Sequence, residues 1–448
     1  MSGRLAIVLH THMPYVEGFG TWPFGEEWLW EAIATSYLPL LDVLDERPGR
    51  VTLSLTPVLA DQLAAPGVAE RFAAFMHEIR PESHRLDVEA HPEVAPQLDR
   101  SAARYRTAAE HFEARGRDLV TAFAPHVRWT SAATHPVLPL LATDAGIRLQ
   151  LETGIASHRA RFGDWDGGLW LPECAHAPWL DERLAEAGVR VACVDLTDHG
   201  VDPLTPLRTP DGPVLAPIDR SIVDLVWSPA GYPSAGPYLD THAHTTRRHL
   251  AWSVDGRPYD AERARAQLRA HADDFAERVA ARVARGGLSV CALDTELLGH
   301  WWPEGVFWLA QAIDACEARG VPIVPLGDAV GDAVALTSAL PVTSWGEPRT
   351  LATWSAPSAG GLAWRQRAAE LEVLAAGGRA GERALRELLA LQSSDWAFLV
   401  SRGTAGPYPL ERADGHERAL RAALTDPGAE PALRNLAPRL AVPALTRG

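Results

Sequence analysis

The run Leu5-Ala6-Ile7-Val8-Leu9 passes directly into His10-Thr11-His12, so a short aliphatic segment ends in polar side chains. Short runs rich in Val, Ile and Leu, bounded by turn residues, are typical of buried strands. Here they alternate with longer helical patterns, which predicts βα units around a parallel sheet. The predicted strands are Leu5–Leu9, Val51–Leu55, Val127–Ser131, Ile147–Leu151, Gly168–Leu171, Val191–Val194, Val214–Pro217, Leu288–Leu293 and Val321–Val324. Their number and spacing favour a closed barrel over an open sheet, with one or two of them outside it.

Two helical regions accompany this α/β pattern: one interrupts it and the other follows it. Between the second and third predicted strands, residues 58–125 are polar and helical, and they are too long for a simple connection. We therefore expect a catalytic (β/α) barrel from residues 1–57 and 126–335, interrupted by a helical insertion at 58–125. Beyond it the composition shifts to Ala, Leu, Arg and Glu, which predicts a C-terminal helical domain over 336–448.

Composition excludes several functions. The 448 residues carry 42 basic and 57 acidic side chains, a net charge of −15, and every basic residue is Arg. Without Lys, the chain cannot perform Schiff-base chemistry or supply a P-loop lysine. The acidic balance argues against nucleic acid or an anionic membrane as partner. Four widely spaced cysteines, no basic leader and no long apolar segment predict a cytoplasmic protein.

Polar side chains follow several predicted strands where the strands end. His10 and His12 follow the first strand, His135 the third, Glu173 the fifth and Asp294 the eighth. Loops at the carboxyl ends of parallel strands converge on one face of a barrel, so these side chains should share one rim. Taken singly, each has a simpler explanation: a strand-end acid is often a helix cap, and a His-x-His is often structural. Their coincidence favours a site.

Two chemistries fit such a rim. A His-x-His with a carboxylate could hold zinc. Alternatively, Glu173 and Asp294 form a carboxylate pair acting on a glycosidic bond, with histidines binding sugar hydroxyls. Trp outnumbers both Phe and Tyr, 16 against 10 and 7, and aromatic faces pack well against sugar rings. Trp170, Trp301 and Trp302 lie near the two acids in sequence, which favours the second chemistry.

Several motifs resemble those of glycoside hydrolase family 57, and within it the 1,4-α-glucan branching enzymes. The matching segments are His10-Thr11-His12-Met13-Pro14-Tyr15-Val16, Trp22-Pro23-Phe24-Gly25-Glu26-Glu27-Trp28-Leu29, Ala132-Ala133-Thr134-His135, Trp170-Leu171-Pro172-Glu173-Cys174, Asp294 to Gly305, and Ser394-Asp395-Trp396. The resemblance covers nearly the whole chain. It implies a distorted seven-stranded (β/α) barrel and a retaining mechanism without a cofactor or a metal.

The resemblance also implies roles for individual residues. Glu173 would be the nucleophile and Asp294 the general acid/base. The expected substrate contacts are His10, His12, His135, Tyr232, Trp252, Trp354 and Asp395. Tyr232 matches a loop tyrosine that covers the site, so its replacement by Ala should shift the enzyme towards hydrolysis. Trp252 would be the gating tryptophan.

The implied activity is branching of glycogen or a related α-glucan. An α-amylase or a 4-α-glucanotransferase of the same family is the close alternative, and a metal-dependent polysaccharide deacetylase is the alternative from another class. The oligomeric state and the length of the transferred chain stay open.

Overall fold

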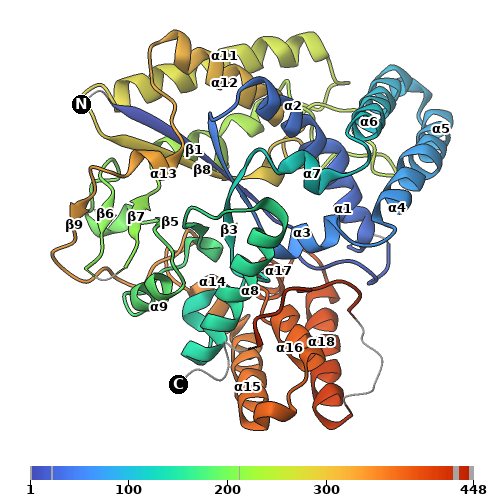
Figure 1. The fold of residues 1–448 in the computed structure, drawn as a ribbon. Helices are drawn as coiled ribbons and strands as arrows, with labels where there is room; N and C mark the ends of the chain where they lie inside the picture. Colours follow the sequence, from blue (N-terminus) through green and yellow to red (C-terminus); the bar gives the residue numbers. More distant parts are fainter. Residues whose placement is uncertain (1–2, 22–23, 211, 427–432, 443–448) are drawn as a thin grey trace.

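A computed structural model describes residues 3–21, 24–210, 212–426 and 433–442, so Trp22 and Pro23 of the second motif lie outside the described residues. Nine strands form one sheet (Figure 1). They are β1 (Arg4–Thr11), β2 (Val51–Leu55), β3 (Val127–Ser131), β4 (Gly168–Trp170), β5 (Val191–Val194), β6 (Leu207–Arg208), β7 (Val214–Pro217), β8 (Leu288–Asp294) and β9 (Val334–Ala335). The strand order is β8-β1-β2-β3-β4-β5-β7-β6-β9, and every pair is parallel except β6 with β7.

Two predicted strands are absent from this sheet. Ile147–Leu151 lies within helix α8 (Asp144–Phe162), because the Thr143 hydroxyl caps the helix by accepting from the Gly146 N–H at 3.1 Å. A short buried aliphatic run has the same appearance in a strand and in a buried helix, so the prediction was wrong. Val321–Val324 forms no strand either, and Ile323 makes only an isolated bridge to Leu5.

The seven parallel strands other than the two-residue β6 and β9 curl into the predicted distorted barrel. Its two ends, β7 and β8, form no ladder among the described residues, but the Asp219 N–H after β7 donates to Val290 O at 2.9 Å. The buried Asp219 carboxylate also accepts from Ser289 and Arg282, both at 2.9 Å. One backbone bond and two side-chain bonds therefore join the end of β7 to β8 and to the helix before β8, where a strand ladder is missing.

Helices surround the barrel (Figure 1). The barrel helices are α1 (Glu26–Ala32), α2 (Leu38–Glu46), α8, α9 (Leu180–Glu186), α10 (Arg220–Trp227), α11 (Ala261–Arg282), α12 (Gly305–Ala318) and α13 (Leu326–Ala329). Between β2 and β3 lie α3 (Pro57–Leu63), α4 (Val68–Ala74), α5 (Arg80–Ala90), α6 (Ala95–Ala114) and α7 (Leu119–Phe123). The C-terminal helices are α14 (Ala352–Ser355), α15 (Gly360–Ala376), α16 (Glu382–Leu391), α17 (Ser394–Arg402) and α18 (Tyr408–Thr425). The limits of the three predicted domains stay a prediction.

The C-terminal helices pack against the barrel rim. Their core residues, including Leu388 and Trp396, belong to the same buried apolar cluster as Tyr15 after β1 and Ala133 after β3. Arg412 of α18 is itself buried and donates to the Tyr15 carbonyl at 2.6 Å. This packing holds the start of α17 next to the strand ends.

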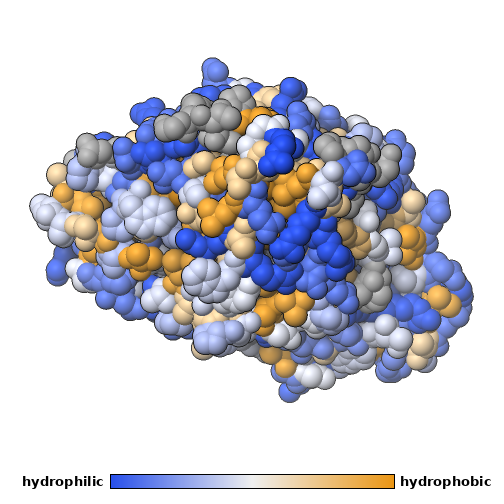
Figure 2. Space-filling view, turned by 90° about the horizontal axis from the view of Figure 1, so that it is seen from below, coloured by the Kyte–Doolittle hydropathy of each residue, from blue (hydrophilic) through white to orange (hydrophobic). Residues whose placement is uncertain are grey.

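Hydrophobic residues lie in small groups between hydrophilic ones on the face seen in Figure 2. All four cysteines are buried and free. In the described part of the chain, no helix combines the length and the apolar character that crossing a membrane requires.

Candidate active site

A cavity of about 1120 Å³ opens where β1, β3, β4 and β8 end. This is the face on which barrel loops converge. Six of the nine predicted site residues line it: His10, His12, His135, Glu173, Asp294 and Asp395. The first five come from strand ends, and Asp395 comes from α17 of the C-terminal helices.

Glu173 stands in a 3-10 turn, Pro172–Cys174, directly after β4, with φ of 62°. This left-handed conformation costs a non-glycine residue about 1–3 kcal/mol. Two backbone bonds hold it: Cys174 N–H donates to Leu171 O at 2.8 Å, and Trp345 N–H donates to Glu173 O at 2.9 Å. The turn thereby aims the Glu173 carboxylate into the cavity.

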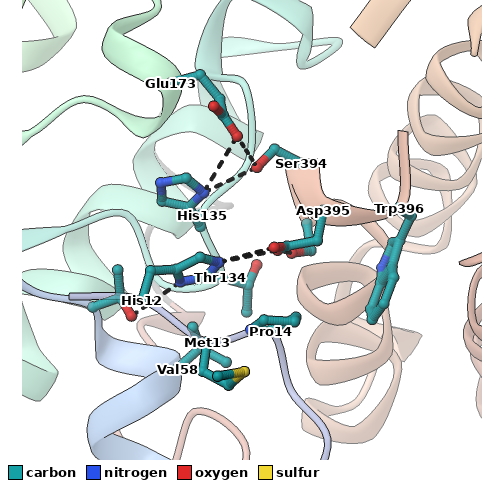
Figure 3. A network of polar contacts seen from close by, with 12 residues as sticks. His12, Met13, Pro14, Val58, Thr134, His135, Glu173, Ser394, Asp395 and Trp396 are labelled. Carbon is teal, nitrogen blue, oxygen red and sulfur yellow. Dashed lines mark hydrogen bonds and ion pairs between the residues drawn. The ribbon is translucent and has the colours of Figure 1, made fainter. Parts of the chain in front are cut away.

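Two donors bind the Glu173 carboxylate. Trp345 Nε1–H donates to Oε2 at 2.9 Å. The Ser394 hydroxyl donates to Oε1 at 2.8 Å (Figure 3). Burial raises the pKa of Glu173, while these two hydrogen bonds act in the opposite direction. Hydrogen bonds to a carboxylate favour its ionised form.

Asp294, the last residue of β8, has different surroundings. It pairs in register with His10 of β1, so both side chains stand at the same level of the rim. Burial and the neighbouring carboxyls Glu296, Glu173 and Asp395 raise its pKa well above the ordinary value. Among the described residues no hydrogen-bond donor reaches its carboxyl, so its protonated form is favoured.

These surroundings give the two acids different proton affinities. A group with two donors favours the ionised form, and a group that faces only like charges favours the protonated form. Two carboxyls in one site whose environments separate their pKa values are suited to act as nucleophile and acid.

His12 and Asp395 form a partly buried ion pair beside these acids. His12 Nε2 lies 3.0 Å from Asp395 Oδ2, and His12 Nδ1 lies 3.1 Å from Thr56 Oγ1. Burial opposes the charge on both, but their attraction prevails: the pKa of His12 is raised and that of Asp395 falls to about 2. The pair presents charged hydrogen-bonding groups to a polar ligand.

His10 and His135 are neutral by contrast. Burial, together with the neighbouring His12, holds the pKa of both well below the ordinary value. His10 stacks on Trp170 with ring centroids 4.6 Å apart, and its Nε2 lies 3.0 Å from His135 Nε2. Ring nitrogens of His10, His12 and His135 lie within 4.8 Å of one another, a spacing that a metal ion could use.

Three predicted site residues do not line this cavity. Tyr232 is buried beside α11, where its hydroxyl donates to Asp274 at 2.7 Å. Trp252 packs near His91 with ring centroids 6.2 Å apart. Trp354 is 1% exposed inside the C-terminal core.

Some tryptophans line the cavity and others are buried in the core. Trp28 and Trp301 line the cavity, and Trp301 is 54% exposed. The other described tryptophans of the motifs are buried in the core: Trp170, Trp302, Trp354 and Trp396. The predicted sugar-stacking role of Trp170 and Trp302 is therefore wrong, because neither exposes a ring face.

The cavity also contains residues that the sequence analysis missed. The Glu296 carboxylate accepts from the His12 N–H at 3.0 Å and the Tyr37 hydroxyl at 2.6 Å, and burial raises its pKa to about 7. Its position two residues after Asp294 was the available signal. Ser394 belongs to the matching motif Ser394-Asp395-Trp396, but nothing in the sequence shows that Ser394 or Trp345 reaches Glu173.

Comparison with known proteins agrees with this geometry. A model described as "Glycosyl hydrolase family 57" matches residues 129–332, and one described as "1,4-alpha-glucan branching enzyme, C-terminal" matches residues 365–432. A Mycobacterium tuberculosis protein called a "probable 1,4-alpha-glucan branching enzyme" is 32% identical, over 94% of this chain and 91% of its own. The 1,4-alpha-glucan branching enzyme of Thermococcus kodakarensis is 29% identical, over 93% and 73%.

Solved structures give the same result. The family 57-type branching enzyme of Pyrococcus horikoshii is 30% identical with a TM-score of 0.89, covering 100% of this chain and 96% of that one. The Thermococcus kodakaraensis branching enzyme, solved with glucose and additives, is 28% identical with a TM-score of 0.91, covering 99% and 96%. An α-amylase of Thermotoga maritima, 22% identical over the full length of both chains with a TM-score of 0.83, shares the fold. The chain therefore belongs to glycosyl hydrolase family 57, among its 1,4-α-glucan branching enzymes.

Proposed function

We propose that this protein cleaves an α-1,4 bond of a glucan and re-forms it as an α-1,6 branch with retention of configuration. The observation that carries the proposal is the carboxyl pair in one cavity: among the described residues, two donors reach Glu173 and none reaches Asp294. A retaining mechanism needs one carboxylate to attack and one carboxylic acid to protonate.

The reaction then follows in two balanced steps. The Glu173 carboxylate attacks the anomeric carbon while Asp294 gives its proton to the leaving glycosidic oxygen, which leaves a covalent glycosyl-enzyme. Asp294, now ionised, accepts the proton of the 6-hydroxyl of a second glucan chain as that oxygen attacks. The Glu173 carboxylate is released and the α-1,6 bond is formed.

The polar groups around the acids are suited to hold the donor sugar. We propose that four residues bind its hydroxyl groups, because all of them line the cavity that contains the two acids: His10, His12, His135 and Asp395. The charged pair and the neutral rings offer both donors and acceptors. Tyr232, Trp252 and Trp354 have no such position, so their substrate roles rest on resemblance alone.

Branching and hydrolysis share the glycosyl-enzyme and differ in whether a sugar hydroxyl or water resolves it. Incubation with amylose, followed by measurement of α-1,6 linkages and new reducing ends together, separates the outcomes. Branching gives new α-1,6 linkages without an equal gain in reducing ends. Reducing ends alone would indicate an α-amylase, and longer unbranched chains a 4-α-glucanotransferase.

The three histidines make a metal-dependent deacetylase the second candidate. That enzyme would release acetate from an acetylated polysaccharide and would lose this activity in a chelator. We expect amylose branching to persist in the chelator and no acetate to be released. Acetate release that stops on chelation would replace the branching proposal.

The substrate we propose is glycogen or a related α-glucan, acted on in the cytoplasm. A neutral polymer needs no attractive charge, which suits a chain with net charge −15. The four free, buried cysteines suit a reducing compartment.

A further inference from the structure

Ser394 connects the C-terminal helices to the catalytic rim. It is the first residue of α17, and its N–H donates to His135 O at 3.0 Å. Its hydroxyl lies 2.8 Å from Glu173 Oε1 and 2.9 Å from His135 Nδ1 (Figure 3). No other residue of the C-terminal helices contacts the Glu173 carboxylate among the described residues.

The direction of these hydrogen bonds follows from counting protons. A serine hydroxyl has one hydrogen, and an ionised Glu173 can only accept, so the hydroxyl donates to Glu173. The second contact of the hydroxyl must then be accepted from His135 Nδ1–H. A neutral His135 that is protonated at Nδ1 has a bare Nε2, which accepts from His10 Nε2–H at 3.0 Å. The hydrogen bonds are therefore donated in series, from His10 to His135, from His135 to Ser394 and from Ser394 to Glu173.

Other charges face Glu173 from each neighbouring element. His12, which follows β1, and Asp395 of α17 act on it with opposite signs, and the Asp294 carboxyl at the end of β8 lies beside it with its protonated form favoured. His135 Nδ1 lies 3.9 Å from Oε1 but is neutral. Trp345 binds the other carboxylate oxygen. Ser394 is thus one of two neutral donors that favour an ionised Glu173 in a site containing several acids.

We propose that Ser394 is a positioning residue, whose hydroxyl, directed by His135, orients the Glu173 carboxylate for attack and keeps it ionised. This inference rests on the proposed role of Glu173 as nucleophile. The C-terminal helices thereby complete the nucleophile as well as contributing Asp395 to the cavity.

The test uses the full-length protein and the pH profile of kcat/KM for α-maltosyl fluoride. Fluoride leaves with little help from an acid, so the acid limb of the profile reports the nucleophile. Ser394→Ala should raise the pKa of Glu173 and move this limb about one unit to higher pH, because a hydrogen bond to the ionised form is lost. At pH values below the acid limb, kcat/KM of Ser394→Ala should be about tenfold lower than that of the wild type.

Matched variants separate this effect from packing. Ser394→Thr keeps the donor and should retain the wild-type limb, whereas Ser394→Cys keeps the volume but donates weakly and should shift the limb as Ala does. Ser401→Ala removes a hydroxyl from the same helix that bonds Thr353 O, so it should change nothing. An unshifted limb in both Ala and Cys variants overturns the inference. If Glu173→Gln is also active, the proposed function itself fails.

Discussion

The two catalytic carboxyls occupy opposite kinds of surroundings in one cavity. Glu173 follows β4, in a left-handed turn, and receives hydrogen bonds from a loop and from a C-terminal helix. Asp294 ends β8 in regular strand geometry and faces three other carboxyls. Burial raises the pKa of both acids, but the two donors oppose the rise at Glu173, whereas the neighbouring carboxyls add to it at Asp294, so the fold favours protonation of Asp294 over protonation of Glu173.

This difference shows which parts of the structure give the two acids different proton affinities. The strand ends bring both acids to one rim, but they do not decide which acid keeps its proton. Hydrogen-bond donors from outside the barrel do so, because a donor stabilises a carboxylate and an uncompensated like charge destabilises it. The comparison can be tested at each acid separately.

The largest effect is expected at the nucleophile. Glu173→Gln should lower amylose branching by roughly four orders of magnitude, because no covalent intermediate can form. Thermal unfolding should stay close to wild type. Glu182→Gln, a change on the exposed surface of α9, provides the control and should keep full activity. Substantial turnover by Glu173→Gln would show that another residue attacks.

The acid partner should give a smaller loss that depends on the leaving group. Asp294→Asn should slow branching of amylose about 10²–10⁴-fold, because general acid assistance is lost. Release of fluoride from α-maltosyl fluoride should fall much less in the burst phase. Equal losses on both substrates would contradict the assignment of Asp294 as the acid.

The wild-type pH profile should be bell-shaped. As pH falls through the pKa of Glu173 the nucleophile is protonated, and as pH rises through the raised pKa of Asp294 the acid is lost. With α-maltosyl fluoride the alkaline limb should weaken while the acid limb remains. An alkaline limb that is equally steep on both substrates would assign it to another group, such as Glu296.

The pH dependence of thermal unfolding should also differ between variants of the two acids. Folding raises the pKa of Asp294, so its contribution to the free energy of unfolding falls as pH rises through that pKa. Asp294→Asn should therefore unfold a few degrees above wild type at pH 8 and at the same temperature as wild type at pH 3. Glu173→Gln should bring a smaller gain, because the pKa of Glu173 is raised less and an amide group cannot accept from both Trp345 and Ser394. Equal gains would mean that the two environments do not differ.

The smallest effect concerns Tyr232, which lies outside the cavity. Tyr232→Phe removes only the hydrogen bond to Asp274 and should cost about 1 kcal/mol of unfolding free energy. The ratio of branching to hydrolysis should not change. The resemblance predicts a shift to hydrolysis in Tyr232→Ala, so a shifted ratio in the Phe variant would mean that the loop reaches the site during turnover.

Sequence reasoning located the strands and both acids for one reason. Buried parallel strands need continuous aliphatic runs, and their carboxyl ends share one edge, so His10, Glu173 and Asp294 could be placed together. The reasoning failed at Ile147–Leu151, where a capped helix uses a similar run. It also failed at Trp170 and Trp302, because composition cannot distinguish a buried ring from an exposed one.

The sequence by itself determined the barrel strands, the carboxyl pair and the family. Only the tertiary structure decided that Trp345 and Ser394 bind Glu173, while no donor from the described part of the chain binds Asp294. Trp345 lies 172 positions from Glu173 in the sequence, and Ser394 lies 221 positions from it, so no local pattern encodes these contacts. The proton affinities of the two acids depend on the final packing of loops and C-terminal helices onto the rim, because burial and hydrogen bonding exist only after the chain is folded.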